Sequence, residues 1–369
     1  MHFICQRDEL LSALNAALRA IPSRSPMQIL ENLYIRADSD GLSLTGSDLN
    51  FGVEARFSGT IETEGEILLP GRLFGEIVRK LPAGEVSLQV NDRFTAVIRV
   101  NGSRTTLQGL SAQEYPRLPE IENAHNIELS AEAFRDMVQQ TSFAVAQDDS
   151  RPILTGCLLE IDGETINMVA LDGFRLALKT CDLLSASEAF SCVIPGRSLQ
   201  EIARLIGDGD ESLTLQFSPS HAFMALGALR AAIRLLDGEF VKYRQLIPSE
   251  SQTTMRVNRD ALSDCVERAF LMAREGRNNL LKFSISEENL TISSNSELGD
   301  VFEQLPIISQ GNPLEISFNA RYISDAIKAL SVEEVLFKCN TSISPCVLTP
   351  VEGEDFTFLV LPVRTYQGA

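Results

Sequence analysis

A threefold internal repeat runs the length of the chain. Three segments of alternating apolar residues end in steps of 124 residues, at Asp48, Asp172 and Ser296. A second block, which reads as strand, short turn and helix, recurs in the same order in steps of 125 and 124 residues and is centred on Arg72, Arg197 and Arg321. An order and spacing kept over all 369 residues are not expected by chance. The repeat therefore predicts three tandem units in place of a single large domain.

Each unit is expected to contain two helices. The first follows a short strand and is predicted over residues 8–20, 131–143 and 259–272, and the second over 72–81, 197–206 and 321–330. Alternating patterns elsewhere predict about eight short strands in each unit. We therefore predict an α+β protein of three domains, each with two helices packed on antiparallel sheets. The expected boundaries are 1–122, 123–250 and 251–369.

The charge of the chain argues against a conventional DNA-binding protein. There are 50 acidic and 32 basic residues, and a net charge of −18 repels phosphate backbones. The second helices oppose this trend, because each places basic residues on the flank away from its apolar stripe. In the first unit the stripe is Leu73, Phe74, Ile77, Val78 and Leu81.

The basic positions recur as pairs: Arg72 with Arg79, Arg197 with Arg204, and Arg321 with Lys328. A surface that stays cationic three times in an acidic chain is expected to face a polyanion. The sequence contains no tryptophan and no helix-turn-helix or zinc-finger pattern. Contact with duplex DNA is therefore expected to involve phosphates and to be independent of base sequence.

Other classes of protein are disfavoured. No apolar run reaches the roughly 20 residues of a membrane span, and no signal peptide is recognisable. Seven scattered cysteines without a C-x-x-C pair suit the cytoplasm. We expect no metal or cofactor, because three histidines lack ligand spacing, nucleotide motifs are absent, and the acidic loop Gly207–Glu211 lacks the spacing of a calcium loop. Asp48 and Asp172 are interpreted as turn residues and not as a catalytic pair.

With these features, the chain resembles the bacterial replicative sliding clamps, the beta subunits of DNA polymerase III. The resemblance is carried by the repeat and by Leu44–Asp48, Ala170–Leu176, Phe240–Pro248 and Leu359–Arg364. It implies a non-catalytic processivity factor, a head-to-tail dimer that forms a six-domain ring around duplex DNA, and helices that line the hole. The DNA-facing residues would be Arg24, Arg72, Arg79, Arg135, Arg197, Arg204, Arg321 and Lys328.

The resemblance also implies an interface between subunits. It would join the first domain of one chain to the third domain of another. The residues assigned to it are Arg104, Leu107, Leu271, Met272, Glu297 and Asp300. Thr105 stands where the family often has a large apolar residue.

A peptide groove is implied between the second and third domains. It would bind short linear motifs of the polymerase III alpha subunit, the clamp loader, other polymerases and repair proteins. The assigned residues are Leu154, Leu171, Gly173, Phe174, Arg175, Leu176, Val241, Gln245, Leu246, Pro345, Leu359, Val360, Leu361, Pro362, Val363 and Arg364. An ordinary core role is the alternative for Leu154, Leu176 and Val360.

Several positions depart from the family pattern. Phe174 replaces a frequent histidine, Val241 a proline and Gln245 an arginine. The loop Gln147–Ile153 is unusually acidic, and the tail Thr365–Ala369 is an extension. These departures motivate a second hypothesis, a clamp-fold scaffold or regulatory paralogue that binds partner peptides without being loaded on DNA.

Overall fold

We describe the chain from a computed structural model that covers residues 1–121, 125–148, 150–209, 212–276 and 279–364. Two compact units are present, residues 1–132 with 201–235 and residues 133–200 with 236–369. Asp149, Asp210, Glu211 and the tail Thr365–Ala369, which entered the predictions above, lie outside the described residues.

The predicted helices are present. The first helices of the repeats are α1 (Arg7–Ala17), α3 (Ala131–Thr141) and α5 (Arg259–Ala273), and the second are α2 (Gly71–Lys80), α4 (Gly196–Ala203) and α6 (Ala320–Lys328). Short 3₁₀ turns lie at Leu18–Ala20, Gln28–Glu31, Ser142–Ala144, Pro152–Thr155 and Tyr243–Leu246. Asn319 begins α6 as an N-cap, because its side-chain oxygen accepts the N–H groups of Arg321 at 3.0 Å and Tyr322 at 3.4 Å.

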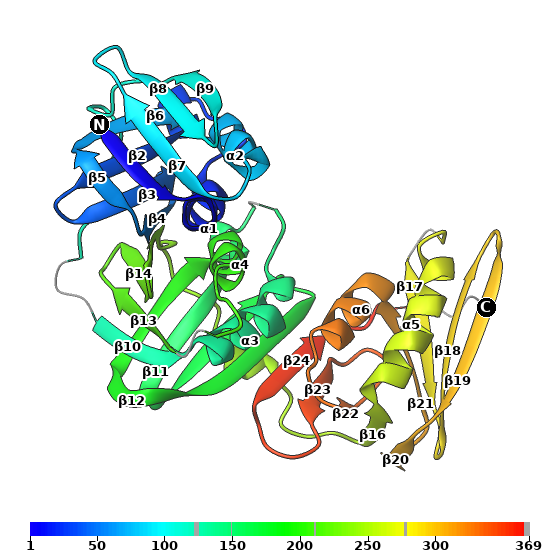
Figure 1. Ribbon diagram of the computed structural model, residues 1–369. Helices are drawn as coiled ribbons and strands as arrows, with labels where there is room; N and C mark the ends of the chain where they lie inside the picture. The colour runs from blue at the N-terminus through cyan, green and yellow to red at the C-terminus, as the bar shows by residue number, and fades with distance from the viewer. Residues whose placement is uncertain (122–124, 149, 210–211, 277–278, 365–369) are drawn as a thin grey trace. The chain divides into compact units, whose positions relative to one another are not determined.

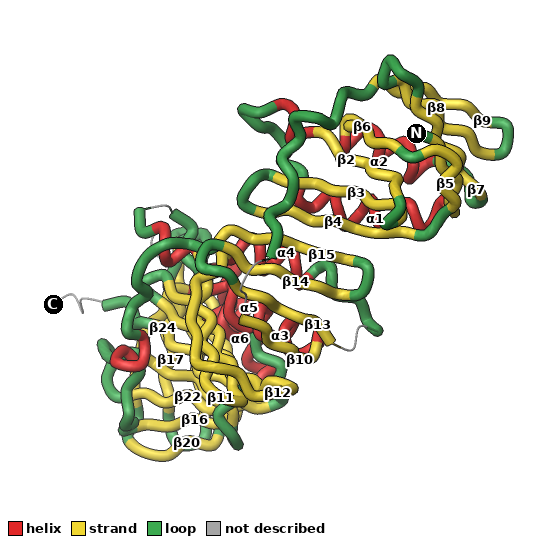
Figure 2. The backbone as a smooth tube through the Cα atoms, turned by 90° about the vertical axis from the view of Figure 1, so that its left-hand side faces the viewer, coloured by secondary structure: helices red, strands yellow, loops and turns green. Residues whose placement is uncertain are grey.

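The first unit contains two antiparallel sheets. One has the order β5 (Thr60–Thr63), β1 (His2–Gln6), β7 (Glu85–Val90), β8 (Thr95–Val100) and β9 (Ser103–Gln108). The other has the order β10 (His125–Ser130), β13 (Ser212–Phe217), β14 (His221–Leu226), β15 (Leu229–Arg234), β4 (Phe51–Phe57), β3 (Gly41–Ser47), β2 (Asn32–Asp38) and β6 (Gly65–Pro70). In Figure 2, α1 and α2 lie on one face of the sheet formed by β2, β3, β4 and β6.

The second unit also contains two antiparallel sheets. One has the order β11 (Gly156–Leu171), β12 (Arg175–Pro195), β24 (Phe356–Val360), β23 (Cys346–Pro350), β22 (Glu334–Cys339), β16 (Thr253–Asn258) and β20 (Ile308–Gly311). The other has the order β19 (Gly299–Pro306), β18 (Asn289–Ser296), β17 (Leu280–Ile285) and β21 (Leu314–Asn319). Figure 1 shows α5 and α6 side by side against the latter sheet.

Neighbouring repeats share sheets. β15 of the second repeat pairs with β4 of the first from Leu229 opposite Ala55 to Ile233 opposite Phe51. β12 of the second repeat pairs with β24 of the third from Arg175 opposite Val360 to Lys179 opposite Phe356. Each junction between repeats is therefore a continuous antiparallel sheet.

Two expectations about local structure were wrong. Leu73 was assigned to an apolar stripe, but its side chain is 48% exposed, and α2 instead buries Phe74, Gly75 and Val78. The second repeat has two long strands where short ones were expected, since β11 has 16 residues and β12 has 21. Gly163 shifts the register of this hairpin without ending either strand, as a β-bulge does.

All seven cysteines are free thiols, and none is exposed. Cys181 and Cys192 are half-buried, and the other five are buried. Burial raises the pKa of Cys181 to about 11 and that of Cys192 to about 12, so both are protonated at neutral pH. Within the described residues, no helix is long and apolar enough to cross a membrane.

Candidate functional site

An apolar cluster in the second unit forms the centre of the candidate groove. Residues from the β11–β12 hairpin, from β23 and β24, and from the segment before β16 pack together. Its buried members are Leu154, Leu158, Val169, Leu171, Leu176, Val193, Phe240, Tyr243, Val347 and Leu359. Leu361 is partly buried against it. The cluster thus contains four of the residues assigned to the groove from the resemblance and two buried aromatic residues that were not assigned.

Three apolar side chains of the assigned set are exposed. Val241 is 40%, Leu246 is 46% and Phe174 is 57% exposed. Gln245 and Gly173 are also exposed, and Pro345 and Pro362 are half-buried. Exposed apolar groups of this kind, beside a packed cluster, are available to the apolar anchors of a partner.

Val360 does not face this cluster. Successive side chains of a strand point to opposite faces, and Leu359 already faces the cluster. Val360 is fully buried on the other face, opposite Arg175 on β12 and Cys346 on β23. Its side chain is therefore not accessible from the groove. Leu154 and Leu176 are each 2% exposed, so they contribute to the packed floor.

A tight turn presents Phe174. One carboxylate oxygen of Asp172, Oδ1, accepts the backbone N–H groups of Phe174 at 2.9 Å and Arg175 at 3.0 Å. Gly173 adopts a φ of +91°, which side chains disfavour. The backbone oxygen of Phe174 accepts the N–H of Leu361 at 2.8 Å. These contacts fix the backbone that carries the Phe174 ring.

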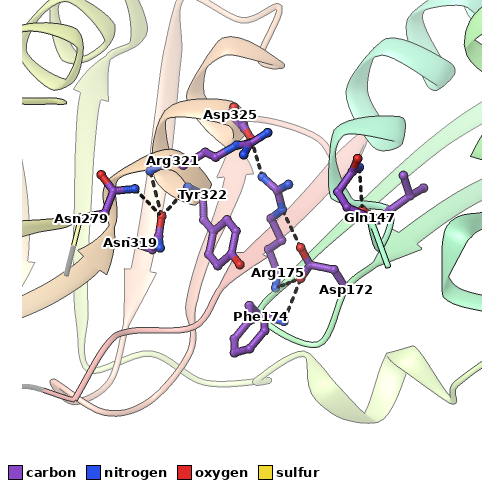
Figure 3. A network of polar contacts seen from close by, with 10 residues as sticks. Gln147, Asp172, Phe174, Arg175, Asn279, Asn319, Arg321, Tyr322 and Asp325 are labelled. Atoms are coloured by element: carbon purple, nitrogen blue, oxygen red, sulfur yellow. Dashed lines mark hydrogen bonds and ion pairs between the residues drawn. The ribbon is translucent and has the colours of Figure 1, made fainter. Parts of the chain in front are cut away.

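Arg175 lies at the centre of a polar network (Figure 3). Its Nε donates to Asp172 Oδ2 at 3.0 Å, and its Nη1 donates to Asp325 Oδ2 on α6 at 2.7 Å. The Arg175 side chain is 5% exposed. Its guanidinium carbon lies 4.7 Å from the ring centroid of Tyr322 and 5.4 Å from that of Phe143. The network joins the second repeat to the third.

Sequence reasoning missed Tyr322 and Asp325. The positions equivalent to Tyr322 in the other repeats are Leu73 and Ser198. The change to an aromatic residue in the third repeat alone could have marked Tyr322 as a candidate functional residue. The Tyr322 ring stacks on the Phe174 ring, with centroids 5.8 Å apart and an angle of 22° between the planes. Tyr322 thus belongs beside the assigned groove residues.

The chain after β24 borders the same region. Val363 N–H donates to Ser317 O on β21 at 2.8 Å, which attaches the segment to the neighbouring sheet. Arg364 is exposed, whereas Leu361, Pro362 and Val363 are half-buried. The segment therefore runs from the Phe174 turn to β21.

The basic residues of the helices are solvent-accessible. Arg24, Arg72, Arg79, Arg197, Arg204, Arg321 and Lys328 are exposed, and Arg135 is half-buried. Lys328 pairs with Glu267 at 2.9 Å, Arg204 with Glu201 at 2.5 Å, and Arg321 lies 3.9 Å from Asp325. Among the described residues, Arg24, Arg72 and Arg197 form no ion pair. These three cations are available to phosphates.

Two strands end their sheets and carry assigned interface residues. Arg104 and Leu107 lie on β9, which ends the five-stranded sheet, and Asp300 lies on β19, which ends the four-stranded sheet. Leu271 on α5 is 56% exposed, whereas Leu107 is only 9% exposed. Arg104, Glu297 and Asp300 are exposed, and Met272 is half-buried, with its sulfur 3.0 Å from Ser296 Oγ.

Arg268 of α5 fixes the β19 edge. Its Nη2 donates to Glu303 Oε2 at 2.7 Å, and its Nε donates to Glu303 Oε1 at 2.9 Å. This bidentate contact lowers the pKa of Glu303 below its usual value. In the part of the chain that the structure describes, no cluster of three potential metal ligands occurs.

The chain is similar to proteins of one family over its whole length. The models of the DNA polymerase III beta subunit match in its N-terminal domain at residues 1–119, its central domain at 128–242 and its C-terminal domain at 244–364. The beta sliding clamp of Bacillus subtilis is 35% identical, and that of Staphylococcus epidermidis is 34% identical. Each match covers 99% of this chain and 100% of the relative.

Solved structures give the same result. The DNA polymerase sliding clamp of Bacillus subtilis superposes with a TM-score of 0.95 at 35% identity and covers 99% of this chain and 100% of that chain. The DNA polymerase III beta subunit of Pseudomonas aeruginosa superposes with a TM-score of 0.93 at 27% identity and the same coverage.

Proposed function

Because the chain belongs to the DNA polymerase III beta subunit family, we propose that it keeps polymerase on its template by closing around duplex DNA. The protein is a DNA sliding clamp and processivity factor. Its three clamp domains follow the boundaries 1–122, 123–250 and 251–369. The protein acts on DNA, at the nucleoid in the cytoplasm.

Closure requires a second copy of the chain. At both junctions between repeats within one chain, the strands already pair in a continuous sheet. The other two sheets end in β9 and β19, which are therefore the strands proposed to join one chain to the next. Terminal strands leave backbone hydrogen-bonding groups unpaired, and head-to-tail association of β9 with β19 satisfies them. Two such joints convert two chains of three domains into a closed homodimer.

DNA contact is assigned to the second helices of the repeats. The recurrence of exposed cations on α2, α4 and α6, in a chain of net charge −18, is the observation that carries this assignment. Contacts to phosphates alone are weak and independent of base sequence, so they permit sliding. Encirclement then prevents dissociation.

The groove on the apolar cluster tethers the partners. Short linear motifs of the polymerase III alpha subunit, the clamp loader, other polymerases and repair proteins insert apolar anchors beside Val241, Leu246 and Phe174. Tethering raises the effective concentration of polymerase at the template. The chain itself carries no catalytic machinery in this mechanism, and a separate loader opens the ring.

Retention on circular DNA tests this function. The protein is loaded with its cognate clamp loader and ATP on a nicked circular plasmid, and the bound fraction is measured after a wash in high salt. We expect salt-resistant binding that is lost when the plasmid is linearised. Loss in salt from both forms would contradict encirclement and favour the scaffold hypothesis.

A further inference from the structure

Four planar groups contact one another in succession beside the groove. The guanidinium carbon of Arg175 lies 5.4 Å from the ring centroid of Phe143 and 4.7 Å from that of Tyr322. The Tyr322 ring in turn stacks on the Phe174 ring, with 5.8 Å between the centroids. Phe143 itself packs edge-on against Phe358 of β24, with centroids 5.3 Å apart. The series therefore begins at a half-buried ring that packs against the buried Phe358 and ends at a side chain that is 57% exposed.

Arg175 is held too firmly and too deeply to serve as a partner contact. Two carboxylates bind it, Asp172 of the same repeat at 3.0 Å and Asp325 of the third repeat at 2.7 Å, and its side chain is 5% exposed. A guanidinium between aromatic rings is attracted to their faces, and it holds them in place. Arg175 is therefore a positioning residue for Tyr322, and through it for Phe174.

Phe174 has a supported face and an open one. Tyr322 covers one side of its ring, and the Asp172 turn and the hydrogen bond from Leu361 fix its backbone (Figure 3). An exposed phenyl ring that is already ordered loses little conformational entropy when a ligand covers it. Stacked aromatic pairs gain interaction free energy beyond that of the area they bury.

We propose that the open face of Phe174 is a stacking platform for an aromatic side chain of the partner peptide. This makes Phe174 a determinant of peptide specificity, and Arg175 and Tyr322 its support. The inference rests on the proposed function, since it assumes that the groove binds peptides.

Paired peptides test the platform. The probes are twelve-residue segments from the groove-binding region of the cognate polymerase alpha subunit, in which each apolar anchor in turn carries phenylalanine or leucine. Fluorescence anisotropy gives Kd for each. At one anchor, we expect the wild-type protein to bind the phenylalanine peptide roughly fivefold more tightly than the leucine peptide.

Variants assign that preference to residues. Phe174→Leu should reduce the ratio to about one while Kd for the leucine peptide stays within about twofold, and Phe174→Tyr should retain the ratio. Tyr322→Leu and Arg175→Lys should lower the ratio by removing or loosening the support. Phe94→Leu is the matched control, because Phe94 is a 38% exposed phenylalanine in the other compact unit, outside the apolar cluster, and it should leave the ratio unchanged.

The outcomes separate this inference from the function on which it rests. If both peptides bind equally at every anchor, and Leu246→Ser weakens both, the groove assignment stands and the stacking platform is wrong. If a preference exists but Phe174→Leu retains it, the platform is also wrong. If neither peptide binds the wild-type protein, the groove assignment fails and the platform with it.

Discussion

The equivalent positions Asp48, Asp172 and Ser296 all stabilise turns, and Asp172 also binds an arginine. Asp48 Oδ1 accepts the N–H groups of Asn50 at 2.9 Å and Phe51 at 2.7 Å, and Ser296 Oγ accepts that of Leu298 at 3.2 Å. The prediction that Asp48 and Asp172 are turn residues is therefore confirmed, as short polar side chains stabilise turns this way. Only Asp172 also uses its second oxygen on an arginine.

Asp325 should matter for stability because its partner is buried. We expect Asp325→Asn to reduce the free energy of unfolding by about 1–3 kcal/mol, because the Arg175 guanidinium loses one of its two carboxylates. Asp260→Asn is the control, since Asp260 is 73% exposed in its pair with Arg259 and should change little. Urea unfolding followed by circular dichroism measures both. Equal effects would contradict a structural role for Asp325.

The Arg268–Glu303 pair should give the β19 edge an acid-sensitive component. Arg268 lowers the pKa of Glu303, so this stabilisation is present above the usual value of 4.5 and is lost as pH falls through the lowered pKa. We expect Glu303→Gln to lower Tm by about 1–3 °C at pH 7, with the difference from wild type vanishing once the pH falls below the lowered pKa. Calorimetry across pH checks this. A difference that persists at low pH would assign the effect to packing.

The helices follow from sequence more closely than the strands. Apolar spacing located all six, and the buried residues Leu199 and Ile202 of α4 and Ile323, Ala326 and Ile327 of α6 agree with it. It failed for Leu73 because a small shift in helix phase moves a border residue out of the core. Strand lengths were harder to predict, since pairing across a bulge at Gly163 is decided by the partner strand.

The edge strands give a prediction about assembly. Leu271 is 56% exposed on α5, beside the β19 edge, and a charge there cannot be buried between subunits. We expect Leu271→Glu to reduce the solution mass from dimer to monomer in light scattering at micromolar concentration.

Leu184→Glu is the control for that experiment. Leu184 is 60% exposed on β12, which lies between β11 and β24 in the seven-stranded sheet and is neither β9 nor β19, and the same charge there should leave the dimer intact. A Leu271→Glu protein that stays dimeric would exclude this face from the interface.

Exposed arginines occur both on helices and on sheets. Arg72 and Arg197 lie on helices, whereas Arg56 and Arg230 lie on β4 and β15. We expect Arg72→Glu with Arg197→Glu to reduce retention on nicked plasmid at least about tenfold, since two phosphate contacts become repulsive, without changing peptide affinity.

Arg56→Glu with Arg230→Glu is the matched control, because it changes the net charge by the same amount. It should retain DNA binding, whereas an equal loss in both double variants would mean that total charge alone governs retention. Loss of peptide binding in the helix variant would contradict the separation of the two sites.

The groove was located by resemblance and not by pattern. Leu154, Leu176 and Leu359 come from distant segments, and pairing of β12 with β24 brings them together. The periodicity of a single segment does not predict contacts between distant segments. It also does not show which of Leu359 and Val360, on opposite faces of the strand, faces the cluster. The support of Phe174 by Arg175 and Tyr322 was likewise invisible, because it depends on contacts between two repeats.

The seclusion of every native thiol has a practical consequence. With all seven sulfur atoms at least half-buried and protonated side chains at Cys181 and Cys192, maleimide dyes should react slowly with the unmodified chain. A single engineered cysteine can then be labelled without first removing the natural ones. A pair of such probes, one on β9 and one on β19, would report opening and closing of the proposed β9–β19 interface in real time by energy transfer.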